Sequence, residues 1–170
     1  MEDLSNDIED FTPDICIVDT PGQMELFAFR NIGAQIAQEL TDAEKGVIYI
    51  FDGLQCKDPL NYVMNMFLAS AINTKFFLPQ YHLISKTDLL SEAELEEMMR
   101  WSEDPYALEE SIDAKLTGMN RSMSQEMMEI IGRIGMDFDP LPVSSANNEG
   151  FADLYSKLML TFTDGGKFTP

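Results

Sequence analysis

The sequence predicts an α/β fold, a three-layer arrangement in which a mainly parallel sheet is flanked by helices. Short apolar runs rich in β-branched residues recur along the chain, and segments with helical spacing separate them. Strands that alternate with helices indicate βαβ units and a parallel sheet. The 170 residues suit a single domain, residues 1–170, because domains most often hold roughly 100–150 residues.

Four segments are predicted to be strands. Each is a continuous apolar run that ends at Asp or Ser, as expected for strands buried between two helical layers. The runs are Ile15–Val18, Val47–Phe51, Tyr81–Ile84 and the weaker Leu141–Val143. Residues 1–13 are polar and acidic, and we interpret them as a frayed lead-in.

Helical patterns lie between these runs. Asp58 and Pro59 supply an N-cap and a first-turn proline for an amphipathic helix, and Ser91 with Glu94 forms a capping box for another. The other helical segments are residues 25–40, 127–134 and 151–162. Residues 100–137 contain no predicted strand and more helix than a crossover needs, so we interpret them as a helical insertion within the domain.

Composition excludes several classes of protein. Eleven basic residues against thirty acidic ones give a net charge of -19, which disfavours direct binding to nucleic acid and to anionic membranes. Five acids among the first ten residues argue against a secretory signal, and no apolar run approaches the ~18 residues of a membrane span. We therefore expect a cytoplasmic protein. The acid excess indicates either a basic protein partner or a salt-rich cytosol, and composition leaves both open.

The cysteines and the histidine predict no metal or disulfide framework. Cys16 and Cys56 are too few for a disulfide scaffold, and Cys16 lies in an apolar run as a small buried residue does. His82 is the only histidine, and we expect it to pack in the core.

The first candidate site follows the first predicted strand, since ligands of open α/β sheets bind beyond the carboxyl ends of the strands. Asp19 can hold Mg²⁺ through water, and Gly22 leaves its backbone N–H free to approach a phosphate. Gln23 can orient a water for attack on that phosphate. A plain strand end with a Pro-Gly turn explains this segment equally well.

The second and third candidate sites follow two later strands. Ser85, Lys86 and Asp88 end the third strand, where a carboxylate can accept two N–H bonds from guanine and a lysine stem can lie along its ring. Ser145 and Ala146 follow the fourth strand and let the backbone approach a base. Each motif alone also fits an ordinary loop, whereas their order and spacing fit one nucleotide pocket.

Together these motifs resemble the switch II, base-specificity and final base-contact motifs of P-loop GTPases, and more closely those of the GPN-loop GTPase family. The resemblance rests on the run from Asp19 to Glu25, on Leu83–Leu90 and on the acidic helical segment around Trp101–Leu116. It covers about residues 14–162 and implies a P-loop NTPase-like fold. Ser85 stands where most GTPases have Asn, whose amide braces the loop.

Two family motifs do not occur in the chain. No Gly-x-x-x-x-Gly-Lys-Ser/Thr and no Gly-Pro-Asn is present, and the only Gly-Lys pair, Gly166-Lys167, is followed by Phe168. The resemblance implies that these segments precede residue 1 in a complete family member, with a strand that lies between those matching residues 15–18 and 47–51. We therefore expect a sheet incomplete at its N-terminal side, and weak or absent binding of GTP by residues 1–170 alone.

By resemblance, the complete protein is a GTPase that binds GTP or GDP with Mg²⁺ and hydrolyses GTP. Asp19 would hold the Mg²⁺, Gly22 and Gln23 would serve catalysis, and Lys86 and Asp88 would recognise guanine. The resemblance further implies a homodimer or a paralogue dimer and a role in assembling or transporting RNA polymerase. The alternative is a non-catalytic protein-interaction module derived from a GTPase; a related ATPase is disfavoured by Lys86-Thr87-Asp88.

Overall fold

A computed structural model describes residue 8 and residues 15–20, 31–41, 43–135 and 138–163. Three strands form a parallel sheet in the order β1-β2-β3: β1 is Val47–Asp52, β2 is Gln80–Ser85 and β3 is Leu141–Pro142. Strands β1 and β2 pair along their whole length, and β3 pairs with only two residues of β2. The parallel sheet predicted from the sequence is confirmed, with β1 at one edge of the sheet that the described residues form.

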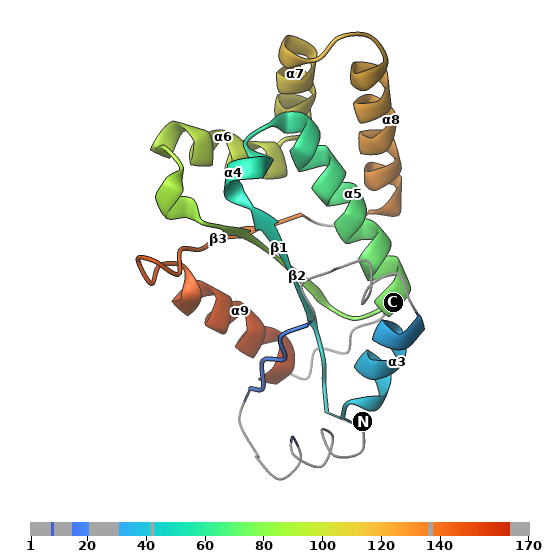
Figure 1. The fold of residues 1–170 in the computed structure, drawn as a ribbon, viewed down its shortest axis with the longest axis vertical. Helices are drawn as coiled ribbons and strands as arrows, with labels where there is room; N and C mark the ends of the chain where they lie inside the picture. The colour runs from blue at the N-terminus through green and yellow to red at the C-terminus, as the bar shows by residue number, and fades with distance from the viewer. Residues whose placement is uncertain (1–7, 9–14, 21–30, 42, 136–137, 164–170) are drawn as a thin grey trace.

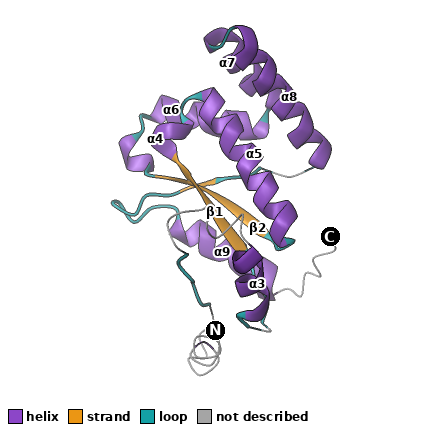
Figure 2. Ribbon diagram, turned by 45° about the vertical axis from the view of Figure 1, so that its right-hand side comes forward, coloured by secondary structure: helices purple, strands orange, loops and turns teal. Residues whose placement is uncertain are grey.

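Helices cover both faces of the sheet (Figures 1 and 2). On one face lies α5, Pro59–Phe76, which packs against α8, Gly118–Ile134. On the other face lies α9, Phe151–Thr163, whose Leu154 and Leu158 pack with Tyr81 and Leu83 of β2. Two separate apolar clusters, one on each face, therefore stabilise a three-layer domain.

The larger of the two apolar clusters contains many residues of α5, a helix whose start is fixed by its sequence. The Asp58 carboxylate accepts hydrogen bonds from the backbone N–H groups of Leu60 and Asn61, and Pro59 occupies the first turn, as predicted. Tyr62 and Val63 are fully buried against the sheet. Burial of side chains of this size contributes about 1.5–3 kcal/mol each to folding.

Five shorter helical segments complete the described fold. Ser91 caps α6 through the predicted capping box. Helices α7 and α8 occupy most of residues 100–137, so that segment is helical as expected. The bounds are α3 Asn31–Glu39, α4 Gly53–Cys56, the 3-10 helix η1 Thr87–Leu89, α6 Glu92–Glu103 and α7 Pro105–Lys115. No helix in the described ranges combines the length and apolar character needed to cross a membrane.

One predicted strand is wrong. Residues 15–20 are described but lie outside any strand, and Cys16, Ile17 and Val18 are exposed, so the expected burial of Cys16 is wrong as well. An extended segment needs a neighbour to pair its N–H and C=O groups. In the described structure residues 15–20 pair with no strand, and of this segment only Ile15 packs against the apolar cluster on the α9 face.

Two single residues of the sequence analysis lie in the core. His82 is buried, and its ring stacks on Phe138 with ring centroids 4.8 Å apart, which confirms the expected core histidine. Trp101 is also buried and donates a hydrogen bond from Nε1 to the hydroxyl of Ser111 at 2.9 Å. That bond satisfies the indole N–H, so the tryptophan packs without leaving a buried donor unpaired.

Candidate nucleotide-binding site

The carboxyl ends of the three strands meet at one edge of the sheet. Asp52 at the end of β1 is in register with Ser85 at the end of β2, and Ile84 is in register with Pro142 of β3. The segments that follow β1, β2 and β3 therefore start side by side, where open α/β sheets bind ligands.

Ser85 fastens the end of β2 to the end of β1. Its hydroxyl donates a hydrogen bond to the carbonyl oxygen of Phe51 at 3.0 Å. Ser85 stands where most GTPases have the asparagine whose amide braces this loop. The hydroxyl instead supplies a tie of its own, between two neighbouring strand ends.

Lys86 and Asp88 form an exposed turn beyond Ser85. Lys86 adopts a left-handed backbone conformation, with φ 60° and ψ 36°, and starts the 3-10 helix η1. The turn is held to the segment after β3, because the N–H of Thr87 donates to the carbonyl of Val143 at 3.3 Å. The two loops predicted to contact a base are thus hydrogen-bonded neighbours.

Ser144 orients the Asp88 carboxylate. The buried Ser144 hydroxyl donates to Oδ1 of Asp88 at 2.6 Å and accepts the backbone N–H of Asn147 at 3.1 Å. A carboxylate oxygen can accept two hydrogen bonds, so Asp88 keeps acceptor capacity on both oxygens for a ligand. Sequence reasoning missed Ser144, since nothing in the pair Ser144-Ser145 shows which hydroxyl turns toward Asp88.

Ser145 and Ala146 lie in the exposed turn that follows Ser144. An antiparallel bridge between Ser144 and Glu149 closes this turn. The structure therefore brings Ser145 and Ala146 to the same edge of the sheet as Lys86 and Asp88.

Asp52 was also missed by sequence reasoning, although it follows a predicted strand as Asp19 does. Its Oδ2 pairs with the ammonium of Lys86 at 2.7 Å, and this hydrogen bond holds the pKa of the Asp52 carboxyl below its usual value. Gly53 follows it, and a Cβ there would lie 2.5 Å from the carbonyl oxygen of Ser85. The glycine permits the close approach of the two strand ends.

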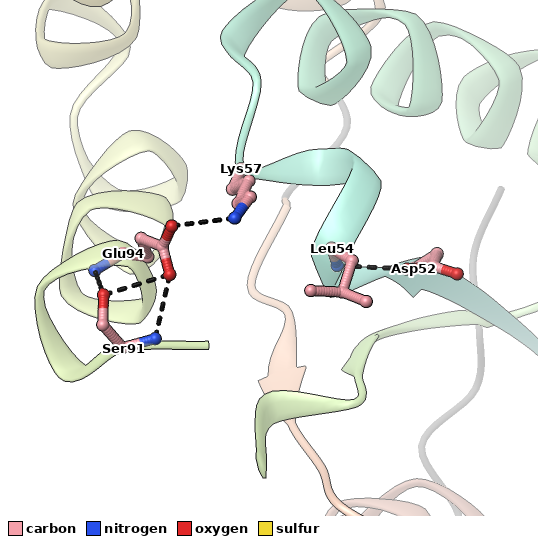
Figure 3. A network of polar contacts seen from close by, with 5 residues as sticks. All are labelled: Asp52, Leu54, Lys57, Ser91 and Glu94. Atoms are coloured by element: carbon pink, nitrogen blue, oxygen red, sulfur yellow. Dashed lines mark hydrogen bonds and ion pairs between the residues drawn. The ribbon is translucent and has the colours of Figure 1, made fainter. Parts of the chain in front are cut away.

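Figure 3 shows how α4, which follows β1, is joined to the start of α6. Asp52 accepts the N–H of Leu54 at the first turn of α4, and Lys57 beyond α4 pairs with Glu94 at 2.9 Å. Glu94 also accepts hydrogen bonds from the N–H and the hydroxyl of Ser91. This network fixes the elements that flank the Lys86 turn.

Comparison with known proteins places the chain in a family. A family model described as a conserved hypothetical ATP binding protein matches residues 1–163. A GPN-loop GTPase of Pyrococcus abyssi is 31% identical over 143 residues, which are 83% of this chain and 56% of that protein. GPN-loop GTPase 1 of Saccharomyces cerevisiae is 30% identical over 146 residues, 80% of this chain and 37% of that protein. The chain belongs to the GPN-loop GTPase family.

A solved structure of this family has the same fold. The crystal structure of a GTPase in apo form from Pyrococcus abyssi superposes with a TM-score of 0.79 and 29% sequence identity, and the match covers 95% of this chain and 64% of that one. The chain thus spans about half the length, or less, of the curated GPN-loop relatives named above.

The phosphate-side candidates are not joined to the base-side loops in the described structure. Asp19 lies in the exposed segment 15–20, and no hydrogen bond or ion pair between described residues links it to Lys86 or Asp88. Gly22 and Gln23 lie outside the described residues. Within the described ranges, no group of three or more His, Cys, Asp or Glu side chains is placed to hold a metal ion.

Proposed function

We propose that this chain carries the guanine-recognition and switch II part of a GPN-loop protein that binds GTP and hydrolyses it to GDP and phosphate. The observation that carries the proposal is the geometry at the carboxyl edge of the sheet. There Ser144 orients the Asp88 carboxylate, and Lys86 in the same turn is paired with Asp52. The description of the matching family model names ATP, whereas the relatives are named GTPases. An aspartate at this position favours guanine, because it accepts from the N1–H and the exocyclic amino group, and adenine offers no such pair of donors.

In the complete protein, Lys86 and Asp88 bind the base, and Ser145 and Ala146 approach its carbonyl oxygen through the backbone. Asp19 is the residue proposed to hold Mg²⁺ through water, which supplies charge neutralisation at the phosphates. Gly22 is assigned a backbone contact to the γ-phosphate, and Gln23 a place near the attacking water. Residues 1–170 supply no Gly-x-x-x-x-Gly-Lys-Ser/Thr cradle, so the activity belongs to the complete protein.

Membership of the GPN-loop GTPase family also suggests binding partners and a cellular location for the complete protein. We propose a dimer, either with a second copy or with a paralogue, and a cytoplasmic role in assembling or transporting RNA polymerase. The acidic helical segment 100–137, which includes Glu103, Glu109 and Glu110, suits a basic protein partner. The net charge of -19 supports a protein partner over direct contact with nucleic acid.

The decisive experiment tests whether a substitution of Asp88 changes the preferred nucleotide from GTP to XTP. In the longest natural form of the protein, Asp88→Asn is expected to weaken GTP binding by roughly 10- to 100-fold, because a hydrogen bond to a charged group is worth about 1.5–3 kcal/mol. The same variant should bind XTP better, since xanthine carries a carbonyl where guanine carries its amino group. Competition against a fluorescent GDP analogue measures both affinities.

Glu149→Gln is the matched control, because it removes one exposed negative charge from the neighbouring loop without touching Asp88. It should leave both affinities within about twofold. An unchanged GTP preference in Asp88→Asn removes Asp88 from the base site. Absence of binding to any guanine nucleotide by the unmodified protein supports instead the non-catalytic interaction module.

A further inference from the structure

The two oxygens of the Asp52 carboxylate have different partners. Oδ1 accepts the backbone N–H of Leu54 at 3.0 Å, at the start of α4, and Oδ2 accepts the ammonium of Lys86 at 2.7 Å. The first bond fixes the carboxylate to the backbone that follows β1 (Figure 3). The second therefore holds the ammonium of Lys86 at a fixed point beside the end of β1.

The other end of the Lys86 side chain is fixed as well. Its Cα lies in a left-handed turn, directly after Ser85, whose hydroxyl is bonded to Phe51. With both ends held, the four methylene groups of Lys86 bridge the ends of β2 and β1. Asp88, two residues farther on, is held by Ser144 from the other side of the turn.

We propose that Asp52 is a positioning residue for base recognition: it holds the Lys86 stem extended, so that the stem presents its apolar side to the purine ring that Asp88 binds. This inference rests on the proposed function, because it concerns the same pocket. A free lysine samples many rotamers, and binding a base has to restrict them. A lysine whose ammonium is already paired loses less freedom when the nucleotide arrives, and affinity rises accordingly.

The pair is poorly suited to a purely structural role. The side chains of Lys86 and Asp52 are 53% and 30% exposed. Ion pairs this accessible to water contribute little to folding. Loss of the pair is therefore expected to change nucleotide affinity and to leave unfolding almost unchanged.

Asp52→Asn isolates the contact with Lys86. Asparagine is as good an N-cap as aspartate, so its side-chain oxygen can still accept the N–H of Leu54. The asparagine side chain has neither a second oxygen nor a negative charge with which to pair the Lys86 ammonium. We expect the variant to bind a fluorescent GDP analogue roughly 3- to 10-fold more weakly in the longest natural form of the protein, the loss of about one hydrogen bond. Asp139→Asn, which breaks an equally short ion pair with Lys157 at 2.7 Å, is the matched control and should bind as the unmodified protein does.

Two further readouts distinguish positioning from general damage. IDP lacks the exocyclic amino group of GDP, and the lysine stem covers both rings alike, so Asp52→Asn should weaken GDP and IDP by the same factor. Asp88→Asn should instead abolish the preference for GDP over IDP. In a Lys86→Ala background, Asp52→Asn should have no additional effect, because Asp52 acts through Lys86.

A measurement without nucleotide tests the geometry alone. In residues 1–170, NMR of the Lys86 ε-methylene should show two distinct proton signals, which merge in Asp52→Asn. Merged signals already in the unmodified chain overturn the inference, whether or not nucleotide binds. Equal GDP affinities of the unmodified protein and Asp52→Asn overturn it too, and leave the proposed function standing. Failure of the unmodified protein to bind any guanine nucleotide overturns the proposed function, and with it the role of Asp52 in base recognition.

Discussion

At the scale of the residue, Glu94 combines two structural contacts in one carboxylate. It closes the capping box with Ser91 and pairs with Lys57, which follows α4. Three hydrogen bonds lower the pKa of Glu94 from 4.5 to about 2. The backbone N–H of Ser91 has the largest effect, and the Lys57 ammonium and the Ser91 hydroxyl add to it. A carboxyl with a lowered pKa stabilises the fold fully above its ordinary value, and the stabilisation is lost as the pH falls from about 4.5 through about 2.

Glu94→Gln should therefore be less stable than the unmodified chain at pH 7, and the difference should shrink as the pH falls from about 5 toward 2. A glutamine can still serve the capping box, so the change removes mainly the charge. Urea unfolding at several pH values measures the difference, and Glu96→Gln, at an exposed position on the same helix, is the control. A difference between the two variants that stays constant over this pH range contradicts the prediction.

At the scale of the element, Gly150 and Gly132 lead to opposite expectations. Gly150 has φ +80°, and a Cβ there would lie 2.0 Å from the carbonyl oxygen of Pro142 in β3. Gly132 lies inside α8 with open space around it. Gly150→Ala should destabilise the chain by about 1–3 kcal/mol, and Gly132→Ala should stabilise it by about 0.5–1 kcal/mol, because alanine favours helix.

Each glycine is the control for the other, since both substitutions add one methyl group. Denaturant unfolding of the three chains measures the free energies. Because Gly150 ends the turn that carries Ser145 and Ala146, the first variant should also shift their amide resonances. Equal stabilities of Gly150→Ala and Gly132→Ala are incompatible with the close approach of this turn to β3.

The same scale shows what the sequence could and could not predict. Strands β1 and β2 and helix α5 were predictable because apolar spacing and capping residues are local signals. The segment Ile15–Val18 has an equally strong apolar pattern and yet forms no strand, because pairing depends on a neighbour that the run itself does not specify. Asp88 could be found from its motif, whereas the contacts of Ser144 and Asp52 depend on how three loops approach one another.

At the scale of the whole molecule, excess charge opposes the compact state. Thirty acidic residues outnumber eleven basic ones, so the excess negative charges repel one another. Salt screens that repulsion. The melting temperature should therefore rise between 0.02 and 0.5 M NaCl, concentrations that shorten the screening length from above to below about 10 Å. Near pH 4.5, where carboxyl groups begin to take up protons, the rise should be smaller.

The course of that rise at higher salt separates the two explanations of the acidic surface. Screening is nearly complete once the screening length falls to about 3 Å, at 1 M salt. A protein whose acids serve a basic partner should gain no further stability beyond that point, and its binding to a polylysine probe should weaken steeply with salt. A protein adapted to a salt-rich cytosol should continue to gain stability from 1 to 3 M KCl. A melting temperature that falls throughout the titration would contradict both, and would show that attractive ion pairs outweigh the net repulsion.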